Sequence, residues 1–173
     1  VHHTGDVRVH FVANVDPAEL DAVLPSLSPA TTLVVVISKT FTTVETLANA
    51  RAARSWLLSA MSEDDLAHHL CAVTTAVDQA TAFGVSPDAL FGFWDWVGGR
   101  YSLSSPVGIG IELALGRAGM QALRDGMHAV DVTLTSSPTS RNPVVLLGML
   151  DAWYSELFGA ASKAVVPYAQ DLA

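Results

Sequence analysis

The stretch Leu33-Val34-Val35-Val36-Ile37 constrains the fold of this chain more than any other part of its sequence. It is apolar throughout and β-branched at every position after the first, which is typical of a strand. A strand with one face in water would alternate apolar and polar residues, so an unbroken apolar run favours a strand covered on both faces. We therefore expect a central strand of a parallel sheet over residues 31–37.

Strand and helix patterns alternate around this run. An Asp-Pro pair at Asp16 and three acidic residues after Ser62 are typical helix starts. The elements expected here are a strand over 7–12, a helix over 16–27, the strand over 31–37, a helix from about 43 to 61, a helix over 62–69 and a strand over 71–75. Such alternation predicts an α/β fold: a parallel sheet flanked by helices, of the doubly wound, three-layer type.

The pattern changes after Ser86. An aromatic stretch occupies residues 91–96, and three helices are expected at about residues 105–115, 117–134 and 142–158. The fold therefore gains a helical C-terminal part. Because 173 residues is close to the usual size of one domain, we expect a single domain over residues 1–173.

Charge and cysteine content exclude several classes of function. Nine Lys and Arg residues stand against 17 Asp and Glu, a net charge of −8, which leaves no basic face for nucleic acid. Cys71 is the single cysteine, so internal disulfides and multi-cysteine zinc sites are excluded and a reducing cytoplasm is favoured. The longest apolar runs fall far below the roughly 20 residues that cross a bilayer, so no membrane partner is expected.

The segment Ser38–Thr43, with the sequence SKTFTT, follows the expected central strand and precedes the longest expected helix. In α/β folds, ligands bind at the carboxyl end of a parallel strand, where the next helix offers free N–H groups to a phosphate. The segment lacks glycine, so it would hold a monophosphate by hydroxyl groups. The alternative is a simple helix start, since Thr42 and Glu45 have the spacing of a capping box. We call residues 38–43 the cradle.

Gly98-Gly99-Arg100, which we call the arginine turn, is the second candidate site. Paired glycines remove side-chain bulk where a ligand or another backbone comes close, and Arg100 would then reach a developing negative charge. The alternative, which the turn taken alone favours, is a tight turn whose arginine pairs with a surface carboxylate.

Other candidates are weaker. His68 and His69 are adjacent and point in different directions on a helix, so we expect a solvated pair and no metal site. Cys71 is expected to be a small core residue. The aromatic residues at 91–96 are expected in the core, beneath the arginine turn.

Two separated motifs resemble one family, the glucose-6-phosphate isomerases. The cradle with Glu45-Thr46 resembles the family's phosphate-binding segment, and Phe93–Ser102 resembles its first signature. Gly126–Asp131 and the Trp153-Tyr154 region are also similar to the family. The resemblance implies a sugar-isomerase domain and the reversible conversion of glucose 6-phosphate to fructose 6-phosphate, without a cofactor.

The same resemblance implies roles for particular residues. Ser38, Lys39, Thr40 and Thr43 would line the phosphate pocket. Gly99 and Arg100 would stand beside the reacting carbons, where Arg100 would stabilise the enediolate between C1 and C2. Such enzymes pair as homodimers, so the intact enzyme is expected to be one.

The sequence departs from the family in extent. The family's glycine-rich serine loop, its Glu-Ser-Asn-Gly motif with the catalytic base, its ring-opening His and its late Lys do not occur here. We therefore interpret the chain as an internal fragment, a partial sugar-isomerase domain that binds sugar phosphates weakly and does not turn them over. The alternative is a non-catalytic, sugar-phosphate-binding regulatory module.

Overall fold

A computed structural model describes residues 7–164 of the chain, which divides into two units, residues 1–120 and residues 121–173. The first unit is built on a parallel sheet of three strands in the order β1-β2-β3. The strands are β1 (Val34–Ile37), β2 (Leu70–Val73) and β3 (Leu90–Phe91). Val34 lies opposite Leu70 in the register of the first pair, and Ala72 lies opposite Leu90 in the second. The predicted parallel sheet is therefore confirmed.

The position of β1 within the sheet corrects one prediction. Among the described residues β1 pairs with β2 alone and is an edge strand, whereas β2 is central and all four of its residues are buried. Leu33, just before β1, is half exposed. The unbroken apolar run identified a strand in a parallel sheet but not its place, because an edge strand packed against a helix can be as apolar as a central one.

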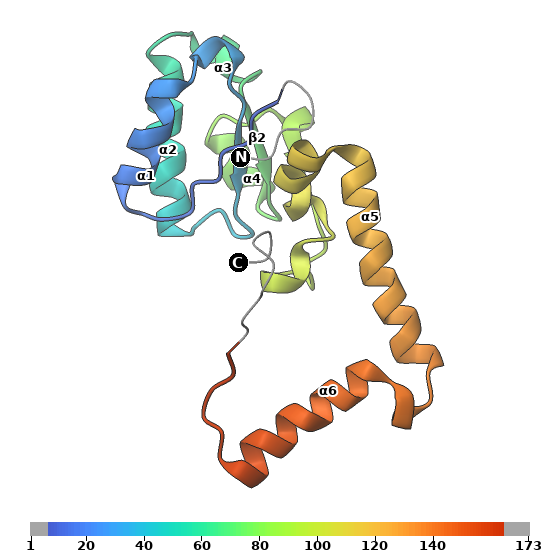
Figure 1. The fold of residues 1–173 in the computed structure, drawn as a ribbon. Coiled ribbons are helices and arrows are strands. Elements are labelled where there is room, and N and C mark those ends of the chain that lie inside the picture. Colours follow the sequence, from blue (N-terminus) through green and yellow to red (C-terminus); the bar gives the residue numbers. More distant parts are fainter. Residues whose placement is uncertain (1–6, 165–173) are drawn as a thin grey trace. The chain divides into compact units, whose positions relative to one another are not determined.

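Helices flank this sheet (Figure 1). The α-helices of the first unit before residue 100 are α1 (Pro17–Val23), α2 (Val44–Leu58), α3 (Glu63–Leu66) and α4 (Val77–Ala82). Short 3-10 turns lie between the helices and strands of this unit: η1 (Leu24–Ser26), η2 (Pro29–Thr31), η3 (Pro87–Ala89), η4 (Gly99–Ser102) and η5 (Pro106–Gly108). Asp16 caps α1 by accepting from the Ala18 amide at 2.9 Å, and the Ser62 hydroxyl accepts from the Asp65 amide at the start of α3. Both predicted helix starts are confirmed.

The strand expected over residues 7–12 is wrong. This segment has no regular secondary structure and belongs to no β-ladder of the described chain, and Val7 and Phe11 are at least half exposed. Strand-like residues form a strand only where a neighbouring strand is available for backbone pairing, and local composition does not carry that information.

The core of the first unit lies between β1, β2 and the helices that pack on them. Its buried members are Val36, Phe41, Ala50, Leu70, Ala72, Ala80 and Val85. One of these, Phe41, belongs to the cradle, so the candidate site is built directly on the core.

The helices after residue 105 match the predicted pattern. Helix α5 (Ile109–Ser136) contains a break at Gly116, whose φ of 73° and ψ of 168° are not helical, as the separate expected helices on either side of residue 116 imply. The second unit continues with η6 (Thr139–Arg141), α6 (Pro143–Ala152) and a π-helical turn, η7 (Trp153–Leu157). Within residues 7–164, no helix is both long enough and apolar enough to cross a bilayer.

Candidate functional site

The cradle lies at the carboxyl end of β1 and leads directly into α2. The Ser38 amide donates to the Val73 carbonyl at 3.1 Å, which extends the β1–β2 ladder by one residue, and the Ser38 side chain is buried. Thr43 is the N-cap residue of α2. The first turn of a 15-residue helix therefore faces the cradle with its free N–H groups and the positive end of its dipole.

Phe41 shapes the loop by turning the backbone. It has a φ of 53°, in the left-handed region that bulky residues rarely adopt, and its side chain is buried. The ring packs edge-to-face against Phe83, with centroids 5.6 Å apart. With Phe41 turned into the core, its neighbours Thr40 and Thr42 remain exposed, and their hydroxyl oxygens are 2.6 Å apart.

The hydroxyl groups of the cradle are not used to cap α2. The Thr43 side chain makes no capping hydrogen bond, and it accepts instead from Ser38 Oγ at 3.4 Å. The capping-box alternative with Thr42 and Glu45 is therefore wrong, since the helix begins one residue later than that pattern requires. The cradle presents hydroxyls and amides that an incoming anion can use.

The main chain of Lys39 is fixed by the segment after β2. Its carbonyl accepts three hydrogen bonds: from the Thr75 amide at 3.1 Å, Thr75 Oγ1 at 2.8 Å and Thr74 Oγ1 at 3.1 Å. Thr74 and Thr75 were predicted only as the end of a strand and not as residues of the site. Their place directly after a strand parallel to β1 was the available signal, because the carboxyl ends of parallel strands meet at one edge of the sheet.

The side chain of Lys39 joins the cradle to the segment that carries the arginine turn. Its Nζ donates to the Asp95 carbonyl and lies 3.6 Å from Asp95 Oδ1. Gly98 is also close, since a Cβ built on it would lie 3.8 Å from Lys39 Nζ. The two motifs, 56 residues apart in sequence, therefore meet in one unit.

The arginine turn forms the start of η4. Gly99 has a φ of 56°, which a side chain would strain, and its carbonyl accepts from the buried Ser102 hydroxyl at 2.6 Å. Arg100 is exposed and forms no ion pair with a carboxylate in the described part of the chain. The alternative, in which Arg100 pairs with a surface carboxylate, is therefore not observed among the described residues.

The aromatic stretch before the turn is not core, contrary to expectation. Trp94 and Trp96 are 71% and 81% exposed, and among residues 91–100 only Val97 is buried. The reason is that β3 contains only two residues, so the segment after it leaves the sheet and runs over the surface.

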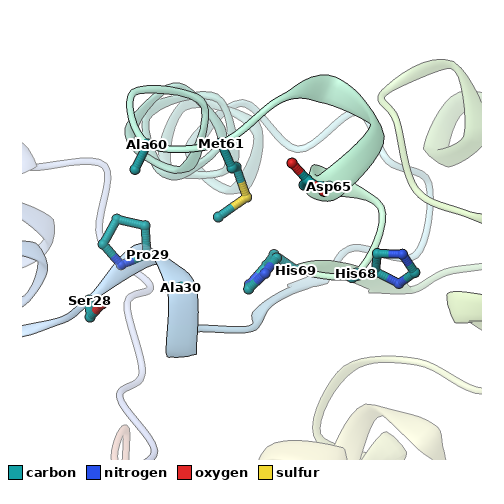
Figure 2. Close-up of a pocket in the computed structure, with 8 residues that line it drawn as sticks. All are labelled: Ser28, Pro29, Ala30, Ala60, Met61, Asp65, His68 and His69. Atoms are coloured by element: carbon teal, nitrogen blue, oxygen red, sulfur yellow. The ribbon is translucent and has the colours of Figure 1, made fainter.

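The pair His68 and His69 lies at the opposite end of the strands from the cradle. His69 comes just before β2, at the opposite end from the cradle, and with His68 and Asp65 it lines a shallow pocket in which the two imidazole rings lie apart (Figure 2). His68 is exposed, as predicted, but His69 is half-buried and its Nδ1 lies 2.8 Å from the Thr32 carbonyl. Among residues 7–164, no three His, Cys, Asp or Glu side chains form a metal-binding cluster.

Cys71 is buried in β2, as predicted, and burial raises the pKa of its thiol. It is a core residue of the sheet and lies away from the cradle. A raised thiol pKa keeps the group neutral, so it is not an activated nucleophile.

The whole chain is similar to one family of known proteins. The family model for phosphoglucose isomerase matches residues 1–173, the whole chain. The chain belongs to the phosphoglucose isomerase family. Among its relatives, glucose-6-phosphate isomerase 3 of Rhodococcus jostii is 49% identical over 166 residues, which are 96% of this chain and 30% of the relative. Glucose-6-phosphate isomerase 1 of Thiobacillus denitrificans is also 49% identical, over 168 residues and the same shares.

A solved phosphoglucose isomerase structure agrees with the fold. The crystal structure of a glucose-6-phosphate isomerase from Chlamydia trachomatis matches 96% of this chain with a TM-score of 0.80 and 32% identity, covering 32% of that protein. The chain thus spans about a third of the length of the family members that it matches.

Proposed function

We propose that this chain carries the phosphate site and the enediolate-stabilising arginine of a glucose-6-phosphate isomerase. The enzyme of which it would be part interconverts glucose 6-phosphate and fructose 6-phosphate. The observation that carries the proposal is the contact of Lys39 with Asp95, which brings the cradle and the arginine turn to one edge of the sheet. A phosphate group and a reacting carbon at opposite ends of one small sugar need two such neighbouring sites.

In this proposal Ser38, Lys39, Thr40 and Thr43 surround the phosphate. The hydroxyls of Ser38, Thr40 and Thr43 and the first amides of α2 supply hydrogen bonds, and the helix dipole favours the negative charge. Gly99 lets the substrate approach the backbone, and Arg100 stabilises the negative charge that develops on the oxygens of the enediolate. The base that moves the proton between C2 and C1 is not among these residues, so the isolated chain would bind substrate weakly and leave it unconverted.

We further propose that residues 1–173 form one partial sugar-isomerase domain of a cytoplasmic, homodimeric enzyme that needs no cofactor. Support for the domain is the family match over the whole chain and the structural match over 96% of it. A single buried cysteine with a neutral thiol suits a reducing compartment.

The proposal is tested by two measurements on the chain as it stands. The first is conversion of glucose 6-phosphate to fructose 6-phosphate, with Arg100→Ala beside the wild type and the exposed Arg51→Ala as the matched control. We expect no turnover from any of the three. Turnover that Arg100→Ala abolishes and Arg51→Ala preserves would show that a residue of this chain acts as the base.

The second measurement is binding of glucose 6-phosphate by calorimetry. We expect weak binding that is lost in the double variant Ser38→Ala/Thr40→Ala, because both changes remove hydroxyl donors from the cradle. Binding that survives this double variant would place the phosphate elsewhere and contradict the proposal. Binding that depends on the cradle but is indifferent to Arg100→Ala would favour the non-catalytic sugar-phosphate-binding module.

A further inference from the structure

Lys39 has an unusual place in the candidate site, because its main chain and its side chain are fixed by different segments. The carbonyl is held by Thr74 and Thr75 at the end of β2, whereas Nζ donates to the carbonyl of Asp95 beyond β3. The residue therefore spans the edge of the sheet from the cradle to the arginine turn. Its ammonium group is directed toward that turn.

The main-chain carbonyl of Asp95 is the more important acceptor. The Asp95 side chain is 96% exposed and its Oδ1 is 3.6 Å from Nζ, so the carboxylate is screened by water and contributes little. The carbonyl lies inside a tight turn, in which the Val97 amide donates to the Trp94 carbonyl at 2.9 Å. A cation bound to the middle of this turn restrains the backbone that leads into Gly98, Gly99 and Arg100.

We propose that Lys39 is a positioning residue that holds the arginine turn beside the cradle through the Asp95 carbonyl, and that it is not chiefly a phosphate ligand. The inference rests on the proposed function, because it assigns Lys39 a part in bringing phosphate group and sugar carbons to one site. Loss of the ammonium then loosens the turn, so contacts to the sugar weaken more than contacts to the phosphate. A direct phosphate ligand would instead affect every phosphate compound alike.

Hydrogen–deuterium exchange of the unliganded chain tests the positioning role without any substrate. In Lys39→Met, which keeps the apolar stem of the side chain but removes its charged group, we expect the Val97 amide to exchange at least about fivefold faster. The Thr74 and Thr75 amides should keep their protection, because they donate to the main-chain carbonyls of Phe91 and Lys39. These two amides are an internal control for folding.

Three further variants sharpen the result. Lys39→Arg should restore the protection of Val97, because a guanidinium can also donate to the carbonyl. Asp95→Asn should remain close to wild type, since it retains the carbonyl. Lys163→Met, which removes a lysine from the second unit, should leave Val97 unchanged. If the Val97 amide exchanged at the wild-type rate in Lys39→Met, the proposal would be overturned. If Asp95→Asn behaved like Lys39→Met, the acceptor of the Lys39 ammonium would be the Asp95 carboxylate and not its main-chain carbonyl.

Affinity for two ligands separates a positioning residue from a phosphate ligand. For Lys39→Met we expect affinity for glucose 6-phosphate to fall about tenfold, and affinity for inorganic phosphate to fall no more than about threefold. Equal losses for both would make Lys39 a phosphate ligand and overturn the proposal. If the wild type bound neither compound, the proposed function would fail, while the exchange measurement would still decide whether Lys39 holds the turn.

Discussion

At the scale of single residues, Phe41 shows how the cradle depends on the core. Its backbone has a left-handed φ between Thr40 and Thr42, and its buried ring packs edge-to-face against Phe83. A left-handed conformation costs a non-glycine residue roughly 1–2 kcal/mol, which the buried ring offsets. The cradle is therefore a strained loop whose shape is maintained by packing below it.

This strain predicts an unusual order of stability for two variants of Phe41. Phe41→Ala should lower the free energy of unfolding by about 3 kcal/mol through loss of the buried ring. Phe41→Gly should be less destabilising than Phe41→Ala by about 1 kcal/mol, because glycine adopts a positive φ without strain. Urea denaturation followed by circular dichroism measures both.

The half-buried Leu47 in α2 is the control for this pair. In a helix, glycine should be worse than alanine by about 1 kcal/mol, the reverse of the order expected at Phe41. The same order at both positions would contradict the left-handed conformation of Phe41.

Asp65 gives a prediction on pH at the same scale. The Ser62 hydroxyl, which donates to Asp65 Oδ2 at 2.7 Å, lowers the pKa of Asp65 below its ordinary value of 3.8, together with a hydrogen bond from the Ser62 backbone. A lowered pKa in the folded state adds stability above the ordinary pKa, and this stability is lost as pH falls through the folded-state pKa. Ser62→Ala should therefore raise the pKa of Asp65, as measured by NMR titration of its carboxyl carbon. A pKa that does not move in Ser62→Ala would rule out this cause.

At the scale of secondary structure, the start of α6 depends on one buried side chain. Asn142 is 1% exposed. Its Oδ1 accepts hydrogen bonds from the amides of Val144, at 3.2 Å, and Val145, at 3.3 Å. Its Nδ2 donates to the carbonyls of Thr133, at 3.2 Å, and Leu134, at 2.9 Å. It thus caps α6 and satisfies carbonyls near the end of α5 within the second unit.

Asn142→Ala should therefore cost about 2 kcal/mol of stability, because it leaves buried amides and carbonyls without partners. Asn142→Asp keeps the acceptor but not the donor, so it should retain the cap of α6 and lose the contacts to α5. Thermal unfolding followed by far-UV circular dichroism would show an intermediate loss for Asn142→Asp. Thr43→Ala, at an N-cap whose side chain makes no capping hydrogen bond to α2, is the matched control and should cost little.

Elements with local signals were predictable from the sequence, and those that depend on distant partners were not. The starts of α1 and α3 and the break at Gly116 follow from capping residues and glycine, which act within a turn. The two-residue β3 has no periodic pattern to detect, and the false strand at residues 7–12 had composition without a pairing partner.

The candidate site likewise has features that the sequence predicted and features that it did not. The cradle could be predicted because a strand, a hydroxyl-rich loop and a helix are consecutive in sequence. The contact of Lys39 with Asp95 could not, since the two residues are 56 apart and nothing local in either indicates the other. The exposure of Trp94 and Trp96 could not be predicted from the sequence either. Apolar composition predicts burial, but it does not show where the chain leaves the sheet.

At the scale of the whole molecule, the second unit exposes more apolar surface than a stable isolated unit usually does. No residue of α6 is buried, although the helix is apolar on nearly all sides. The large apolar side chains exposed on α6 and the segment after it are Leu146, Leu147, Met149, Leu150, Trp153, Tyr154, Leu157 and Phe158. A helix that is apolar all round is typical of an enclosed position in a larger protein.

The isolated chain should therefore bind the dye ANS strongly and self-associate as its concentration rises. Leu147→Glu/Met149→Glu should reduce both, because it places charge on the exposed apolar surface of α6. Val15→Glu/Val77→Glu, at isolated exposed positions of the first unit, is the matched control and should change little. Fluorescence and light scattering measure the two effects, and equal responses in the two double variants would contradict the assignment to α6.

The central claim, that the cradle and the arginine turn form one sugar-phosphate site, is tested most directly by NMR titration of the labelled chain with glucose 6-phosphate. We expect the amide signals of residues 38–43 and 98–100 to shift together with one dissociation constant, and inorganic phosphate to shift chiefly those of residues 38–43. Shifts confined to the cradle with both ligands, or centred on the pocket around His69, would contradict the claim.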